Sequence, residues 1–115
     1  QKGYLINVSS VSGLYGRAGQ ANYATSKGGI IGLTKLLART YNPNQFQINC
    51  IIPGIIDTDM AQAMPPDKIN ALANATSKKR LGLAQEIAKG VVFLSSENAS
   101  YMSGTCLCID GGFFK

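Results

Sequence analysis

The chain contains three short apolar runs, and longer segments with helical periodicity separate them. The runs cover residues 4–8, 46–52 and 105–109, and none of them alternates strictly between apolar and polar positions. Continuous apolar runs of this length are typical of strands that are covered on both faces, as in a parallel sheet. We therefore predict three buried strands joined by helical crossovers.

Helical patterns fill the segments between these strands. Apolar residues recur at three- and four-residue steps from about Asn22 to Tyr41, where Asn42-Pro43-Asn44 stops the pattern. We expect a short helix over 65–75 and another from residue 84, and a flexible loop over 13–20. Connections long enough for helices imply parallel, right-handed crossovers. The fold class predicted is α/β, as half of a doubly wound parallel sheet.

The apolar stripe of the long predicted helix is wide, and Gly28, Gly29 and Gly32 lie within it. Each glycine costs a helix roughly 1 kcal/mol relative to alanine. We therefore expect close packing at these positions, against a sheet, a cofactor or a partner helix.

A sheet of three strands leaves a hydrophobic edge open, and such an edge favours aggregation. We expect another chain segment or another molecule to cover it. The chain also begins with Gln1-Lys2-Gly3 directly before the first strand, without an initiator methionine. We therefore expect something to precede it, so that residues 1–115 form a single partial domain.

Composition narrows the possible functions. The net charge is +5, but the lysines and arginines are dispersed except at Lys78-Lys79-Arg80, so we expect no nucleic-acid partner. A modest positive charge suits an anionic substrate or cofactor equally well. No apolar run is long enough to span a bilayer, and we expect no membrane partner.

Histidine is absent from the sequence, which excludes a serine–histidine or cysteine–histidine catalytic unit within this chain. A zinc site is not expected either, and we predict no bound metal. The three cysteines are Cys50, Cys106 and Cys108, and they form no CxxC pair. Their odd number and apolar surroundings indicate reduced, buried thiols in the cytoplasm or in an organelle matrix.

Tyr23 and Lys27 are the first candidates for chemistry. Their four-residue spacing puts them on one face of the predicted helix, about one turn apart. An ammonium group beside a tyrosine favours the phenolate form, which suits a general acid that acts near neutral pH. By itself the spacing is common, and a surface pair on a helix is the simpler interpretation.

Two further features extend this candidate site. Ser10 lies at the carboxyl end of the first predicted strand, where open α/β sheets place their sites. Its hydroxyl could donate to a substrate carbonyl oxygen, or could simply cap a turn. The segment Pro53-Gly54-Ile55-Ile56-Asp57-Thr58 follows the second strand and could hold a carboxamide through backbone groups and a hydroxyl. Its alternative is a plain strand-terminating turn.

In this order and spacing, the sequence resembles the carboxyl-terminal half of the short-chain dehydrogenase/reductases, over essentially its whole length. Within that family it looks most like the β-ketoacyl-acyl-carrier-protein reductases and acetoacetyl-CoA reductases. The residues that carry the resemblance are Ile6-Asn7-Val8-Ser9-Ser10-Val11-Ser12-Gly13, Gln20-Ala21-Asn22-Tyr23-Ala24-Thr25-Ser26-Lys27, Pro53-Gly54-Ile55-Ile56-Asp57-Thr58, Arg80-Leu81-Gly82 with Glu86-Ile87-Ala88, and Ser103-Gly104 through Asp110-Gly111-Gly112.

The resemblance implies a role for each candidate. Tyr23 would donate the proton to the carbonyl oxygen and contact both substrate and cofactor. Lys27 would favour the tyrosinate and bind the nicotinamide ribose hydroxyls, and Ser10 would orient the carbonyl of the substrate. Pro53, Gly54, Ile56 and Thr58 would form the nicotinamide carboxamide site. The implied fold is the carboxyl-terminal half of a Rossmann-type sheet.

The implied activity is reduction of a ketone to a secondary alcohol with NADP or NAD, on a small-molecule or acyl-carrier thioester, in a homodimer or homotetramer. The family's glycine-rich turn, which holds the cofactor pyrophosphate, has no counterpart in this sequence. We therefore expect the chain to need the upstream half of the same fold to be active. The alternatives are a non-catalytic or split-subunit member with a role in assembly, and the same chemistry on a sugar or steroid alcohol. The location implied is the cytoplasm or the mitochondrial matrix.

Overall fold

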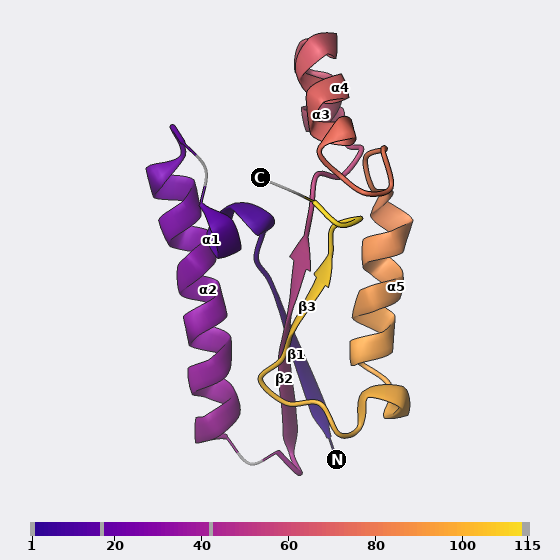
Figure 1. The fold of residues 1–115 in the computed structure, drawn as a ribbon. Helices are drawn as coiled ribbons and strands as arrows, with labels where there is room; N and C mark the ends of the chain where they lie inside the picture. The colour runs from indigo at the N-terminus through magenta and orange to yellow at the C-terminus, as the bar shows by residue number, and fades with distance from the viewer. Residues whose placement is uncertain (1, 17, 42, 114–115) are drawn as a thin grey trace.

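The computed structural model describes residues 2–16, 18–41 and 43–113. A parallel sheet with strand order β1-β2-β3 lies between helix α2 on one face and helix α5 on the other (Figure 1). The elements in chain order are β1 (Gly3–Val8), α1 (Val11–Tyr15), α2 (Ala21–Thr40), β2 (Phe46–Pro53), α3 (Asp59–Gln62), α4 (Pro66–Asn74), α5 (Ala84–Leu94), the 3₁₀ helix η1 (Glu97–Ala99) and β3 (Cys106–Ile109).

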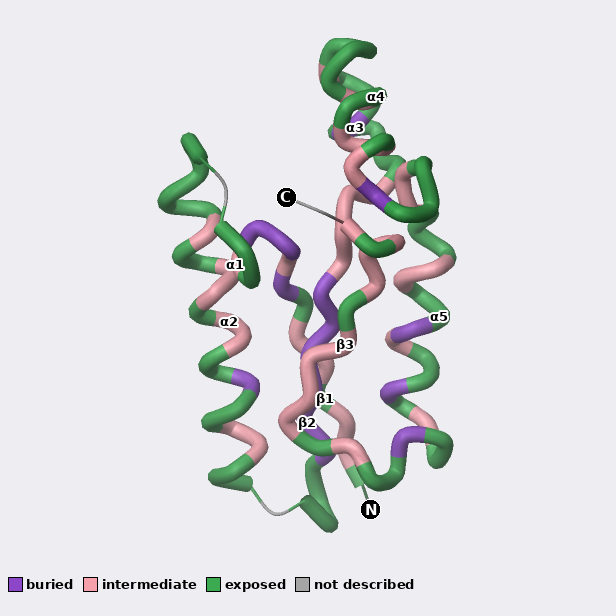
Figure 2. Tube along the Cα trace, viewed as in Figure 1, coloured by how far each residue is buried: buried purple, intermediate pink, exposed green. Residues whose placement is uncertain are grey.

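Strand β2 runs through the middle of the sheet and supplies most of its buried residues (Figure 2). Cys50 and Ile52 pack toward α2, with Val11 and the partly buried Ile30. Ile51 points to the opposite face and packs with Leu94 of α5. Because alternate residues of β2 meet apolar partners on both faces, the strand is mostly apolar, as its sequence pattern predicted.

Two polar side chains on β2 tie the sheet to the segment before β3. Asn49 is fully buried. Its amide donates to the carbonyl of Met102 at 3.3 Å, and its carbonyl oxygen accepts from the amide of Thr105 at 3.0 Å. Gln47 donates in the same way to the carbonyl of Ala99. Their partners satisfy these buried amides, and the same bonds fix where β3 begins.

The parallel strands and the three main helices agree with the prediction, whereas the predicted loop over 13–20 is partly helical. Helix α1 forms because the Ser10 side chain caps its first turn by accepting from the amide of Ser12 at 3.2 Å. Helix α3 was also not predicted, and the Thr58 side chain caps it through the amide of Ala61. Both helices are too short for hydrophobic periodicity to be visible in the sequence.

Close packing at the glycines of α2 is found at one of the three positions. A Cβ at Gly28 would lie 3.2 Å from the carbonyl oxygen of Gly13. At Gly29 and Gly32 an added Cβ would meet nothing within 4 Å. On that side α2 therefore has no neighbour among the described residues.

The cysteines are free thiols, but the prediction that all are buried is wrong for two of them. Cys50 is buried, Cys106 is half-buried, and Cys108 is exposed on β3. Burial raises the pKa of the Cys50 thiol, and the neighbouring Cys106 raises it further. Cys108 differs because β3 is the outermost strand on its side of the sheet.

Helices α3 and α4 form an arm that projects beyond the carboxyl end of the sheet (Figure 1). The base of the arm is fastened to the segment after β3, since the amides of Ser77 and Lys78 donate to the carbonyls of Gly112 and Gly111, each at 3.1 Å. Within the described ranges, no helix is both long enough and apolar enough to cross a membrane.

Candidate active site

Tyr23 and Lys27 lie in the first turns of α2, at the end of the helix next to α1 and the carboxyl end of β1 (Figure 1). The Lys27 ammonium nitrogen is 5.7 Å from the centroid of the Tyr23 ring. The same nitrogen donates to the carbonyl of Val8, the last residue of β1, at 3.5 Å. Tyr23 is 46% exposed.

Two residues lock this part of α2 against the strand end. The Ser9 hydroxyl donates to the backbone carbonyl of Lys27 at 2.6 Å. Gly13 of α1 touches the helix so closely that an added Cβ would lie 2.6 Å from the amide nitrogen of Gly28 and from the carbonyl carbon of Lys27. Only glycine fits at this contact, which is why α1 and α2 can approach each other here.

Ser10 lies between these two contacts, immediately after β1. Its hydroxyl oxygen accepts the Ser12 amide and so caps α1, as the simpler interpretation had it. Accepting one bond leaves the hydroxyl proton free for donation. Ser10 is half-buried, and Ser9 and Lys27 connect it to the helix that carries Tyr23. Capping and carbonyl binding are therefore compatible roles for the same hydroxyl.

The corner after β2 lies at the same edge of the sheet, because β1 and β2 are parallel and Val8 pairs with Ile51. Pro53 ends β2, and the amide of Gly54 donates to the carbonyl of Ile109 at 3.0 Å. A Cβ at Gly54 would lie 2.8 Å from the Cα of Asp110, so the corner is pressed against the end of β3.

Ile56 is held by a parallel bridge to Gly82. The Gly82 amide donates to the carbonyl of Ile55 at 2.9 Å, and the Gly82 carbonyl accepts from the amide of Asp57 at 2.7 Å. These bonds use the groups on either side of Ile56 and leave its own amide and carbonyl outside the bridge. Thr58 is exposed and caps α3 through its hydroxyl oxygen, which leaves the hydroxyl proton for another acceptor.

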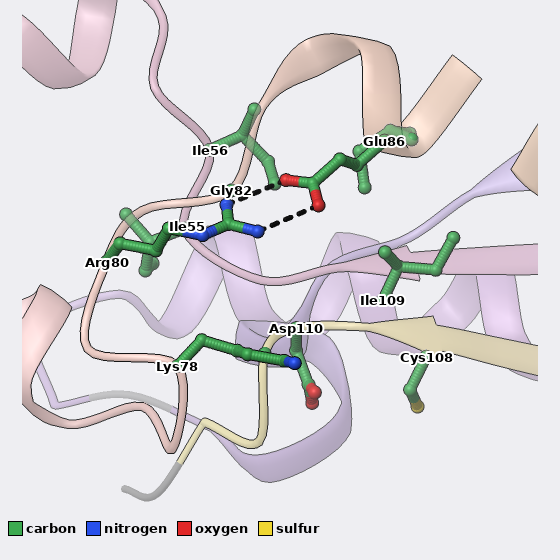
Figure 3. Close-up of a pocket in the computed structure, with 11 residues that line it drawn as sticks. Ile55, Ile56, Lys78, Arg80, Gly82, Glu86, Cys108, Ile109 and Asp110 are labelled. Atoms are coloured by element: carbon green, nitrogen blue, oxygen red, sulfur yellow. Dashed lines mark hydrogen bonds and ion pairs between the residues drawn. The ribbon is translucent and has the colours of Figure 1, made fainter. Parts of the chain in front are cut away.

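A pocket of about 230 Å³ lies on the other side of this corner, between the start of α5 and the end of β3 (Figure 3). Ile55 and Ile56 form part of its wall, together with Lys78, Arg80 and Asp110, and it does not include Ser10, Tyr23 or Lys27. Arg80 pairs with Glu86 through two hydrogen bonds of 2.8 and 2.9 Å (Figure 3). These bonds, with one from the amide of Leu83, lower the pKa of Glu86 to about 2.

Sequence reasoning missed Ser9, Gly13 and Gly82 as parts of this site. All three lie inside the segments that carry the family resemblance, but each acts through a backbone contact with a distant segment. The sequence offered one signal, which is that Ser9 stands directly before the candidate Ser10 at the end of a predicted strand. Only the fold shows which groups the two serines contact.

Comparison with known proteins gives consistent results. A family model described as enoyl-(acyl carrier protein) reductase matches residues 1–114. Proteins named 3-oxoacyl-[acyl-carrier-protein] reductase FabG are 42% identical in Chlamydia trachomatis and 43% identical in Pseudomonas aeruginosa, each over 97% of this chain. A crystal structure of a 3-oxoacyl-[acyl-carrier protein] reductase from Brucella melitensis superposes with a TM-score of 0.92 at 31% identity, over 97% of this chain.

The parallel three-layer fold and these matches agree on one class of protein, an α/β protein with a Rossmann-type sheet. The chain belongs to the short-chain dehydrogenase/reductases, in the family that the matching model describes. It spans 45% of the length of the two bacterial relatives and 42% of the Brucella chain.

Proposed function

We propose that the chain supplies the proton-donating half of an NAD(P)-dependent reductase that converts a β-ketoacyl thioester to the secondary alcohol. Similarity to proteins named 3-oxoacyl-[acyl-carrier-protein] reductase supports this reaction and substrate class. The observation that carries the assignment is Tyr23, with an exposed ring and the Lys27 ammonium 5.7 Å from it, at the edge of the sheet that also holds Ser10. The matching family model is described as an enoyl-(acyl carrier protein) reductase. The bacterial relatives are named 3-oxoacyl reductases, and we therefore favour a β-ketoacyl substrate over an enoyl one.

The residues present fit the nicotinamide end of such a cofactor. The Ile56 amide and carbonyl lie outside the bridge with Gly82, and an amide–carbonyl pair is what a carboxamide needs as donor and acceptor. The Lys27 ammonium donates one long hydrogen bond to the carbonyl of Val8, and its other N–H groups can donate to ribose hydroxyls. Thr58, Pro53 and Gly54 complete the same corner.

When bound in this corner, a nicotinamide cofactor would supply the hydride that the carbonyl carbon takes up. Ser10 donates its hydroxyl proton as a hydrogen bond to the carbonyl oxygen and orients it. Tyr23 gives its phenolic proton to that oxygen, so the product is a secondary alcohol and the tyrosine is left as tyrosinate. The Lys27 ammonium stabilises this anion. Removing a positioned acid of this kind typically costs a factor of about 10²–10⁴ in rate.

The arm formed by α3 and α4 is the candidate substrate cover. Met60 is 84% exposed on α3, and Lys68, Lys78 and Lys79 lie along the arm and its base. Apolar and cationic side chains together suit an acyl chain on a phosphopantetheine carrier. A sugar or steroid alcohol remains the alternative substrate class, and it predicts activity that does not depend on these lysines.

A role in assembly is supported by exposed apolar residues on two helices. Leu36 on α2 is 61% exposed and Val92 on α5 is 69% exposed. Covering these faces with further copies gives the homodimer or homotetramer that the resemblance implies, and a non-catalytic assembly subunit would use the same faces. The cytoplasm or the mitochondrial matrix stays a prediction for where this takes place.

Reduction of acetoacetyl thioesters by the complete protein tests the proposal. We expect oxidation of NADPH or NADH, with the preferred cofactor found by comparing the two, and a loss of kcat of about 10²–10⁴ for Tyr23→Phe. Tyr101→Phe is the matched control, since Tyr101 is fully exposed on the connection after η1. Full turnover in Tyr23→Phe overturns the mechanism. A wild-type protein that binds no dinucleotide favours the assembly role.

A further inference from the structure

The carboxylate of Glu86 connects both ends of the segment from Arg80 to Glu86 through hydrogen bonds. Glu86 accepts from both terminal nitrogens of Arg80, and its Oε1 also accepts from the amide of Leu83 at 2.9 Å. Arg80 in turn donates to the carbonyl of Leu81 at 3.0 Å. These bonds bind residues on both sides of Gly82, so the position of Gly82 is set by the ion pair.

Gly82 is also the residue that bridges to the corner after β2. Its two hydrogen bonds, to the carbonyl of Ile55 and from the amide of Asp57, straddle Ile56. An added Cβ at Gly82 would lie 2.7 Å from the Cδ1 atom of Ile56, so the two segments are in close contact. A displacement of Gly82 is therefore passed directly to the Ile56 backbone.

The ion pair contributes little to overall stability. Its side chains are 49% and 38% exposed, and exposed pairs are weak even with good geometry. Its planar, two-bond arrangement instead restricts orientation. A contact of this kind has more effect on the local geometry around Gly82 than on the free energy of unfolding.

We propose that Arg80 and Glu86 are positioning residues for the cofactor, which act through Gly82 to hold the Ile56 amide and carbonyl ready for the nicotinamide carboxamide. This inference rests on the proposed function. It predicts that the pair affects cofactor binding although neither side chain belongs to the site that contains Tyr23. It further predicts that the thioester KM does not depend on the pair.

Glu86→Gln in the complete protein tests this link, because glutamine keeps the size of the side chain and removes its charge. Amide hydrogen exchange without cofactor should be about fivefold faster at Asp57 and Gly82. The Kd for NADPH or NADH, from titration of nicotinamide fluorescence, should rise about three- to tenfold, with an unchanged KM for the thioester. Arg80→Lys keeps the charge without the two-bond geometry and should show part of both effects.

Two further variants complete the test. Glu97→Gln, a change at an exposed residue of η1, is the matched control and should change neither quantity. The double variant Arg80→Gln/Glu86→Gln should lose less than the sum of the losses of Arg80→Gln and Glu86→Gln, since each single change already breaks the two-bond pair. Thermal unfolding identifies any variant that has lost its fold.

The inference is overturned if amide exchange at Asp57 is unchanged in Glu86→Gln. It is also overturned if exchange becomes faster but the Kd for the cofactor stays the same, or if the losses in the double variant are additive. Failure of the proposed function is recognised separately, by a wild-type protein that neither binds NAD(P)H nor reduces a thioester. The exchange measurement needs no cofactor and distinguishes the two cases.

Discussion

The hydroxyl of Ser9 donates a 2.6 Å hydrogen bond to the backbone carbonyl of Lys27. Ser9 is almost fully buried and is the first residue after β1. Ser10 follows it directly, and Tyr23 lies one turn before Lys27 on α2. This one bond therefore sets how far the candidate carbonyl-orienting serine lies from the candidate proton donor.

Ser9→Ala is expected to lower both stability and kcat. Deleting the hydroxyl leaves a buried contact unmade, which costs about 1–2 kcal/mol of unfolding free energy. Loss of the fixed spacing should also reduce kcat. Urea unfolding and steady-state kinetics on the same preparation measure the two effects.

The control for this experiment is Ser95→Ala. The Ser95 hydroxyl also donates to a helix carbonyl, that of Val91 at 2.9 Å, but it is exposed and lies at the end of α5. We expect a change in stability within about 0.5 kcal/mol and normal kcat. If both variants have the same kcat, the Ser9 bond does not position the catalytic groups.

Gly13→Ala is expected to push α1 away from α2. The new methyl group would meet backbone atoms of Lys27 and Gly28 at 2.6 Å, and backbone cannot move aside as a flexible side chain would. Overpacking of this kind costs about 1–3 kcal/mol. Thermal unfolding and kcat should both fall.

Gly29→Ala on the same helix provides the contrast. Nothing lies within 4 Å of its Cβ position, so alanine adds helix propensity without a clash. We expect a gain of up to about 1 kcal/mol. A Gly13→Ala protein as stable as Gly29→Ala would contradict the close contact between α1 and α2.

The ion pair between Arg80 and Glu86 predicts a small, pH-dependent stability difference between the wild type and Glu86→Gln. The pKa of Glu86 falls from the ordinary value of 4.5 to about 2, chiefly through its hydrogen bonds to Arg80. A lowered carboxyl pKa stabilises the fold above the ordinary value, and this contribution is lost as the pH falls toward the folded-state value. The other charged groups near Glu86 are Lys89 on its own helix and, across the pocket, Lys78 and Asp110.

The measurement is thermal unfolding of both proteins from about pH 7 to about pH 2. The difference in Tm should stay constant down to about pH 5 and disappear near pH 2. The difference between wild type and Glu97→Gln provides the baseline for loss of an exposed carboxylate without an arginine partner. A constant difference for Glu86→Gln across the whole range would show that its charge makes no contribution.

The sequence was sufficient to predict the strands and long helices of this chain. Residues 46–52 are mostly apolar because β2 is covered on both faces, and α2 begins within one residue of its predicted start. Tyr23 and Lys27 share a helix face as their spacing required. Periodicity and spacing are local properties, so local sequence is enough to predict them.

Features that depend on contacts between distant segments could not be predicted in this way. Helix α1 needs the cap of Ser10 and the close approach of Gly13 to α2, which lies well downstream. The exposure of Cys108 follows from its place on the outermost strand rather than from its apolar neighbours. Gly82 lies in a segment that carries the family resemblance, but that segment does not reveal the bridge from Gly82 to Ile56.

The hydrogen bonds from Ser77 and Lys78 to the carbonyls of Gly112 and Gly111 have a consequence for biosynthesis. Chains fold progressively as they leave the ribosome, at roughly 5–20 residues per second. Ser9, Tyr23 and Lys27 can meet as soon as β1, α2 and β2 have emerged. The corner around Ile56 has to wait for Gly82, and the base of the arm waits for Gly111 and Gly112. Within this chain, the contacts around Tyr23 and Lys27 should therefore form first during translation, and the corner around Ile56 last.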